Sequence, residues 1–120
     1  MTLTDLLERI AELPAFEAHC PLTARSQTCV GETPLHVAAV WGDLDAINLL
    51  VDAGADINAI GDRGYTPLHE AVEQGNVQAV KLLLKRGARA DIQNEMAMTP
   101  MSIAMLKDAE ELVQLLKESK

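Results

Sequence analysis

Apolar residues recur along this chain at the spacing of short amphipathic helices. The first predicted helix spans residues 3–13 and carries an apolar face made of Leu3, Leu6, Leu7, Ile10 and Leu13. Pairs of shorter helical segments follow from residue 33 onward, separated by polar segments that contain glycine. The pattern therefore predicts a helical protein built from helix pairs.

Cap residues mark the boundaries of the first pair. Thr33 is suited to cap a helix that has Pro34 at its first position, and Gly42 is suited to end it. Asp43 is expected to cap the second helix, which Gly54 ends because glycine adopts the left-handed conformation without steric cost. The stripe predicted to be buried on this second helix consists of Leu44, Ile47, Leu50 and Val51.

One four-residue motif recurs at a fixed spacing. Thr33-Pro34-Leu35-His36 returns as Thr66-Pro67-Leu68-His69, and Thr99-Pro100-Met101-Ser102 is an altered third copy. The spacing is 33 residues both times. A fixed period of this size indicates stacked units, none of which can bury its apolar face alone.

The second unit repeats the cap pattern, and the third unit departs from it. Gly75 and Asn76 are expected to end one helix and cap the next. In the third unit Asp108 replaces the glycine and Ala109 replaces the capping residue. Terminal repeats need a polar outer face, so this unit is interpreted as a C-terminal cap.

Residues 1–20 are interpreted as a degenerate first repeat, with an unrelated helical extension as the alternative. The resulting domain hypothesis is a single domain over 1–120, comprising an N-terminal cap or degenerate repeat at 1–32, full repeats at 33–65 and 66–98, and a C-terminal capping repeat at 99–120.

Composition narrows the classes of partner. A formal net charge of −8 disfavours nucleic acid and anionic membranes and favours a neutral or basic protein. Asp5 and Glu8 interrupt the first apolar segment, so no signal peptide is expected. Cys20 and Cys29 are compatible with reduced thiols in a cytoplasmic protein, although a disulfide between them is geometrically possible.

The sequence resembles the ankyrin repeat family. The features that carry the resemblance are the recurring Thr-Pro-Leu-His motif, the Ala38-Ala39 that follows its first copy, the closing Gly54-Ala55 and Gly87-Ala88, and the paired leucines. The resemblance implies an all-α solenoid of helix-turn-helix units joined by β-hairpin-like fingers. It also implies that His36 and His69 form hydrogen bonds within and between repeats and are therefore structural.

The resemblance further implies a protein-binding face. In the family, partners usually bind the concave face formed by the fingers and the first helix of each repeat. Carried onto this chain, the binding positions are Val30, Glu32, Val40, Trp41, Asp62, Arg63, Tyr65, Glu73, Gln74, Glu95, Met96, Met98 and Lys107.

Trp41 and Tyr65 are the expected anchors, since these residue types dominate binding energy at interfaces. Acidic residues are expected to surround them. The alternative for Trp41 is packing against the helix layer, and for Met96 and Met98 it is packing against the C-terminal cap.

We expect no catalytic residue, metal or cofactor. A metal cluster of His19, Cys20, Cys29 and His36 is conceivable, but it lacks the paired spacing of a zinc site. The preferred hypothesis is a monomeric binding module that inhibits or neutralises another protein, as antitoxins and immunity proteins do. The alternative is an adaptor or assembly subunit of a larger complex.

Overall fold

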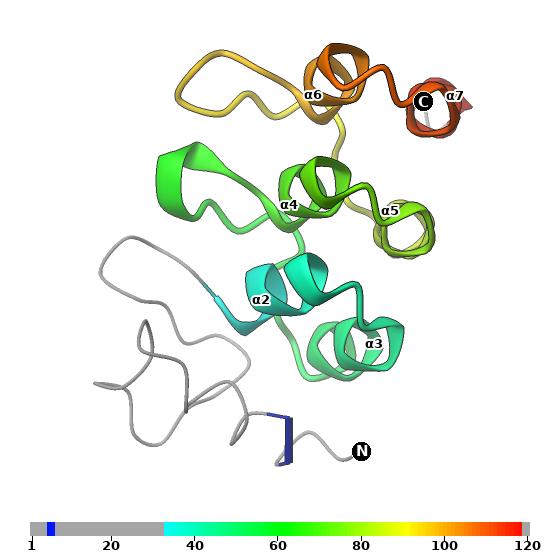
Figure 1. Cartoon of the computed structure of the whole chain (residues 1–120). Coiled ribbons are helices and arrows are strands. Elements are labelled where there is room, and N and C mark those ends of the chain that lie inside the picture. Colours follow the sequence, from blue (N-terminus) through cyan, green and yellow to red (C-terminus); the bar gives the residue numbers. More distant parts are fainter. Residues whose placement is uncertain (1–4, 7–32, 119–120) are drawn as a thin grey trace.

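Three stacked helix pairs make up the described part of the chain in the computed structural model (Figure 1). Residues 5–6 and 33–118 are described, apart from the side chain of Asp62. The inner helices are α2 (Pro34–Trp41), α4 (Pro67–Gln74) and α6 (Pro100–Leu106). The outer helices are α3 (Leu44–Asp52), α5 (Val77–Lys85) and α7 (Glu110–Glu118). The described residues contain no strand, so the all-α fold class is confirmed.

The inner helices form one row and the outer helices form a second row beside it (Figure 1). α2 packs against α4 and α4 against α6, while α3, α5 and α7 pack in the same order. We call the segments 55–65 and 88–98 the second and third fingers; they project from the inner row on the side away from the outer helices (Figure 1). The second finger contains a short 3-10 turn, η2 (Asp62–Gly64).

The fingers turn like hairpins and touch each other. The backbone N–H of Gly61 donates to the carbonyl of Tyr65 at 2.7 Å, and that of Asn94 donates to the carbonyl of Met98 at 2.9 Å. The N–H of Glu95 donates across to the carbonyl of Arg63 at 3.0 Å. Adjacent fingers are therefore held in the same register as the helices behind them.

Most of the expected cap residues act as predicted. The side chains of Thr33 and Thr66 accept hydrogen bonds from the backbone of the third helical residue, and Gly42 and Gly75 end their helices with φ of 68° and 73°. Asp108 takes the same left-handed conformation, with φ of 54°. Aspartate tolerates this region better than most residues, which explains how it can replace glycine there.

Asn76 does not cap its helix as the sequence suggested. Its side chain forms no cap bond with α5. Instead its Nδ2 lies 3.4 Å from the carbonyl oxygens of both Ala39 and Val40, one repeat earlier. An amide can donate to these carbonyls whereas the carboxylate of Asp43, which does cap α3, cannot.

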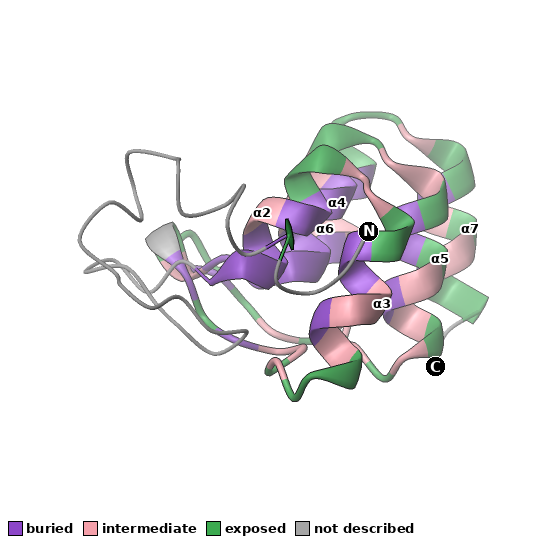
Figure 2. Ribbon diagram, turned by 90° about the horizontal axis from the view of Figure 1, so that it is seen from below, coloured by how far each residue is buried: buried purple, intermediate pink, exposed green. Residues whose placement is uncertain are grey.

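The predicted buried stripe of α3 is confirmed only in its middle. Ile47 and Leu50 are fully buried, as is Ala46, whereas Val51 is only partly buried and 37% of Leu44 is exposed. Leu44 is the first residue of the helix and lines a shallow hollow beside Lys81 of α5, on the outer side of the stack. The small Ala46 takes the buried position instead. Figure 2 shows buried residues on the faces where the helices meet.

Two buried histidines join each repeat to the next. The Nδ1 atom of His69 accepts from the backbone N–H of Thr66 at 3.1 Å, and its Nε2–H donates to the carbonyl of Met98 at 2.9 Å. His36 is bonded in the same way to Thr33 and to the carbonyl of Tyr65, at 3.1 and 2.8 Å. The expected structural role of both histidines is therefore confirmed.

This geometry requires a neutral ring. Nδ1 can accept only when it carries no proton, and burial lowers the pKa of His69 below its ordinary value despite the raising effect of the carbonyl of Met98. The third unit has Ser102 in place of histidine, and its hydroxyl bonds only to Thr99 in the same unit, at 3.1 Å.

Three predictions for the N-terminal region concern residues outside the described part of the chain: the helix over residues 3–13, the cap hypothesis for 1–32 and the pairing of Cys20 with Cys29. Of these residues only Asp5 and Leu6 are described, and both are helical. The proposed repeat boundaries stay a prediction.

The first prediction concerns the core. Leu50→Ala or Leu83→Ala removes a fully buried side chain of an outer helix and should lower the free energy of unfolding by about 2–5 kcal/mol. Urea titration followed by circular dichroism measures this change. Leu44→Ala, at a more exposed position of the same residue type, should cost well under half as much; equal losses would contradict the described burial.

The second prediction compares two glycines with similar φ. A Cβ on Gly64 (φ 76°) would lie 2.8 Å from the backbone nitrogen of Glu95, whereas a Cβ on Gly75 (φ 73°) would meet nothing within 4 Å. Gly75→Ala should therefore cost roughly 1–2 kcal/mol for the left-handed backbone. Gly64→Ala should cost a further 1–3 kcal/mol for the clash between fingers. Equal thermal shifts for both variants would rule out the close approach of the fingers.

The third prediction concerns pH. The folded pKa of His69 lies below 6.5, so its contribution to stability is complete above about pH 6.5 and falls as the unfolded chain takes up the proton. The loss is at most about 1.4 kcal/mol per pH unit. His69→Gln should lose less stability than the wild type between about pH 7.5 and 5.5, measured by urea titration. A His69 ring that titrates above 6.5 by NMR would contradict the neutral assignment.

Candidate functional site

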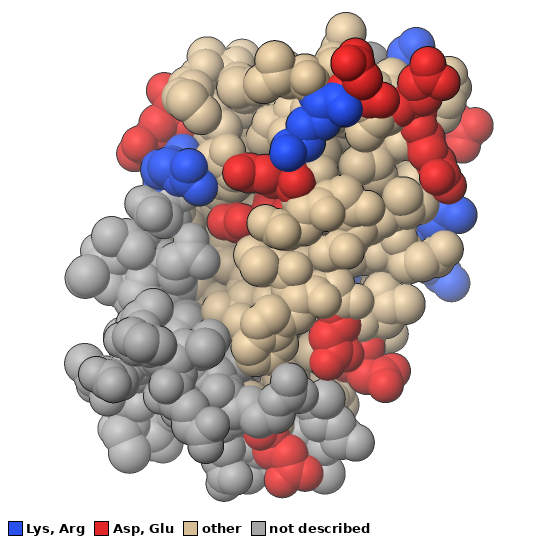
Figure 3. Space-filling model, viewed as in Figure 1, with Lys and Arg blue, Asp and Glu red and all other residues tan. Residues whose placement is uncertain are grey.

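The fingers and the exposed side of the inner helices together form the face on which the expected binding residues lie. We call this surface the concave face. Figure 3 shows Lys, Arg, Asp and Glu side chains of this part of the molecule close to broad areas of other residues. The predicted binding residues on this face include both apolar and charged side chains.

The structure describes most of the predicted positions. Val30, Glu32 and the side chain of Asp62 lie outside the described part. The exposed members are Val40, Trp41, Arg63, Gln74, Glu95, Met96 and Lys107. The partly buried members are Glu73 and Met98, and the buried member is Tyr65.

Val40 and Trp41 are the apolar residues that α2 leaves exposed at its C-terminal end. Their exposed fractions are 37% and 38%. The preceding Ala38 and Ala39 are fully buried against neighbouring helices, so the exposed surface begins abruptly at Val40. Since Gly42 ends the helix in a left-handed turn, Trp41 occupies its last position. A large indole only partly covered at a helix end is a typical contact residue.

Tyr65 is not the exposed anchor that the sequence suggested, because only 4% of it is exposed. The centroid of its ring lies 5.4 Å from that of the His69 ring, and the guanidinium of Arg63 lies over the Tyr65 ring at 4.7 Å from its centroid. Burial raises the pKa of the Tyr65 hydroxyl, and a hydrogen bond donated to Glu73 raises it further. Tyr65 therefore supports Arg63 and Glu73, which are closer to solvent.

The exposed part of this cluster is charged. Glu73 lies in the last turn of α4, and Glu70 lies one turn earlier in the same helix. The Oε2 atom of Glu73 is buried and has no hydrogen-bond partner among the described residues. Buried acceptors are normally bonded, so this oxygen is an exception among the described residues.

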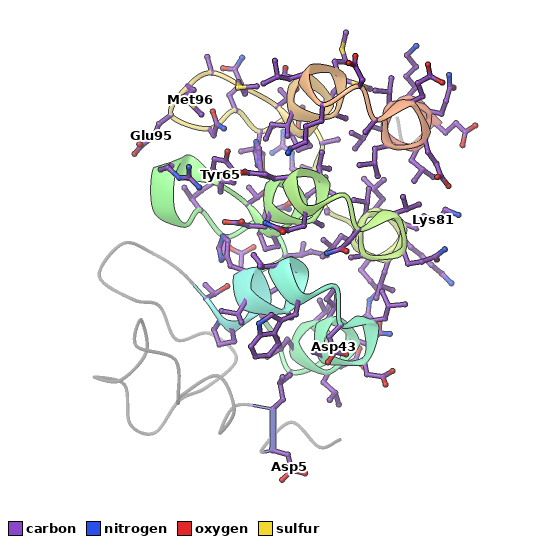
Figure 4. The ribbon with its side chains drawn as sticks, viewed as in Figure 1. Asp5, Asp43, Tyr65, Lys81, Glu95 and Met96 are labelled. Carbon is purple, nitrogen blue, oxygen red and sulfur yellow. The ribbon has the colours of Figure 1, made fainter. Side chains whose placement is uncertain are left out.

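The tip of the third finger presents another apolar side chain. Figure 4 shows Glu95 and Met96 at the tip, with Tyr65 between the second finger and α4. The exposed fraction of Met96 is 60%. Asn94 shapes the tip, because its Oδ1 accepts the N–H of Met96 at 2.8 Å and that of Met98 at 3.0 Å. Met98 is partly buried and packs against the core, whereas 60% of Met96 is exposed.

Met105 is an exposed apolar residue that the sequence reasoning did not single out. Its exposed fraction is 61%, and that of the adjacent Leu106 is 76%. The 33-residue repeat could have drawn attention to Met105, because Ala39 and Val72 occupy the same position in the earlier repeats and are fully buried.

The described residues offer no site for a metal and no membrane span. No group of three or more His, Cys, Asp or Glu side chains among them could hold an ion, and three members of the conceivable cluster, His19, Cys20 and Cys29, lie outside this part. None of the described helices is long and apolar enough to cross a membrane.

Comparison with known proteins shows a match to a repeat family. The family model described as ankyrin repeats (many copies) matches residues 35–84. A curated relative, ankyrin repeat domain-containing protein 45 of Danio rerio, is 49% identical over 43 residues, which cover 36% of this chain and 17% of the relative. The chain thus matches only about a sixth of the relative's length. The two stacked helix pairs from α2 to α5 coincide with the family match, so residues 35–84 are similar to ankyrin repeats in both sequence and arrangement.

Proposed function

We propose that this protein binds, and inhibits or neutralises, a partner protein through its concave face. Ankyrin repeats are in general protein–protein interaction modules, which provides the class of function. The fold itself does not specify a partner, so the proposal depends on the residues that this chain exposes.

The observation that carries the proposal is the exposure of Val40 and Trp41 beside the acidic residues of α4. Glu73 occupies in α4 the position that Val40 occupies in α2, one repeat earlier. α2 and α4 pack side by side, so Val40, Trp41 and the carboxylate of Glu73 lie on neighbouring helices of one surface. An apolar centre beside charged groups is the usual composition of a protein-binding site.

Charge favours a basic partner. The chain carries a formal net charge of −8, which attracts basic proteins and accelerates their association. Glu73 is partly exposed, and its carboxylate provides a local negative charge for a lysine or arginine of the partner. Arg63 lies nearby over Tyr65 and would select against a partner that places a cation there.

An adaptor role is the second candidate. The stack exposes surfaces on more than one side, including Met105 and Leu106 in the last repeat, and several exposed surfaces suit a subunit that holds two partners together. An inhibitor changes the activity of its partner, whereas an adaptor co-purifies with it in fixed proportion and leaves its activity intact.

The fourth prediction tests the surface. Trp41→Ala should remove a hot-spot side chain and weaken capture of the partner about tenfold or more in an affinity pull-down from native lysate. Leu44→Ala is the matched control, because Leu44 has nearly the same exposed fraction but lies on the outer side. Circular dichroism checks that both variants are folded.

Three results are informative. A protein captured by the wild type and the Leu44 variant, but not by the folded Trp41 variant, would support binding through the concave face. Capture that both variants retain would rule this face out. If the captured protein has a measurable activity, its loss on addition of this chain identifies an inhibitor, and its retention in a stoichiometric complex identifies an adaptor.

A further inference from the structure

The last repeat exposes the side of its helices that earlier repeats bury. α6 and α7 lie at one end of the stack, and no described element lies beyond them (Figure 1). Met105 takes the register of the fully buried Ala39 and Val72 but is 61% exposed. Val113 takes the register of the fully buried Ile47 and Val80 but is only partly buried. These residues remain apolar although no helix of the described part covers them.

Met105 and Val113 line a groove of about 610 Å³, together with Gln114 and a rim of three carboxylates. The rim consists of Asp108, Glu110 and Glu111. We call Met105, Val113 and this rim the end surface. No lysine or arginine lines the groove, so its charge has a single sign. Its carboxylates differ from those of the concave face, and its apolar residues come from both helices of the last pair.

We infer that the end surface binds an amphipathic helix of another protein, with an apolar stripe that covers Met105 and Val113 and with lysine or arginine beside it. The shape argument comes from the earlier repeats, where the same side of each pair is covered by helices: α4 covers α2 and α5 covers α3. A surface that packs against helices within the stack has the ridges and spacing suited to a helix.

The partner helix is not simply one more repeat of the same kind. His36 and His69 each reach the backbone of the following repeat, whereas the hydroxyl of Ser102 bonds within its own unit. The histidine bond that attaches one repeat to the next is therefore absent at the end surface, which leaves apolar contact and charge.

The charge excludes a second copy as the best occupant. In a two-fold dimer through this surface, Asp108, Glu110 and Glu111 of both chains would face each other, which is repulsive. Glu110 and Glu111 also favour the N-terminal end of α7, because acidic side chains stabilise that end of a helix. That local effect explains the acidic residues alone, but it does not explain why Met105 and Val113 stay apolar and uncovered.

The fifth prediction uses a defined probe. A fluorescent peptide of about 14 residues, with leucines on one helical face and lysines beside them, spans about four turns. It should bind the wild type with saturable anisotropy, and NMR shifts should concentrate in α6 and α7. The matched peptide with glutamate in place of lysine should bind about tenfold more weakly or worse.

Neutral variants separate this surface from general attraction to an acidic protein. Met105→Gln/Val113→Gln keeps the net charge and should weaken peptide binding about tenfold or more. Leu44→Gln replaces an apolar residue of intermediate exposure elsewhere and should leave binding unchanged. Glu110→Gln/Glu111→Gln should weaken binding and reduce its dependence on salt, because these carboxylates form much of the rim.

The opposing results are equally specific. Peptide binding that the folded Met105→Gln/Val113→Gln variant retains, or that Trp41→Ala abolishes instead, would overturn the inference and place the basic helix on the concave face. A dimer in sedimentation equilibrium that the Met105 variant abolishes would also overturn it, in favour of a second copy. Since Trp41 is not part of the end surface, failure of either proposal is distinguishable from failure of the other.

Discussion

One hydrogen bond, from a buried imidazole to a carbonyl in the next finger, sets the geometry of this stack. It is made by His36 to Tyr65 and by His69 to Met98, 29 residues apart in both cases, and it ties each unit to the next. The ring must accept from a threonine N–H on one side and donate on the other, so only one neutral tautomer fits. The close contacts of the helices, the register of the fingers and the position of Tyr65 follow from this connection between units. Where the histidine is absent, in the third unit, the regular bonding ends.

The local features of the fold could be predicted because they depend on the backbone preferences of single residues. Thr33 and Thr66 as caps, Gly42 and Gly75 in left-handed turns, and the 33-residue stacking need no knowledge of neighbours. The errors arise where a side chain meets another repeat. Asn76 bonds backward to Ala39 and Val40, and Tyr65 is enclosed by His69 and Arg63. A pattern within one unit cannot show which of its residues the next unit covers. The same limit explains why Met105 was missed, since its burial depends on a following helix.

The stack presents two surfaces with different composition. On the concave face, the side chains of Val40 and Trp41 lie beside carboxylates that are themselves held by Tyr65 and neighbouring groups. On the end surface, apolar residues suited to a helix interface lie beside the carboxylates of Asp108, Glu110 and Glu111. A chain that uses both can hold one partner across its row of inner helices and another along its axis. The exposed apolar residues of the two surfaces do not overlap, because Val40 and Trp41 belong to the first helix pair and Met105 and Val113 to the last.

Asn76 also affects how an array of this kind can grow by duplication. In a tandem copy of the second repeat, a new asparagine would face the carbonyls of Val72 and Glu73, which correspond to those of Ala39 and Val40 that Asn76 now contacts. A copy of the first repeat inserted at the same place would bring Asp43, whose carboxylate has no proton to donate to those carbonyls. The side chain of Asn76 occupies the space that a Cβ on Gly42 would enter. The corresponding space at Gly75 is open and would accept the amide of a new asparagine. The two repeats look alike in sequence, but only the second carries the groups needed on both of its sides to be inserted next to itself.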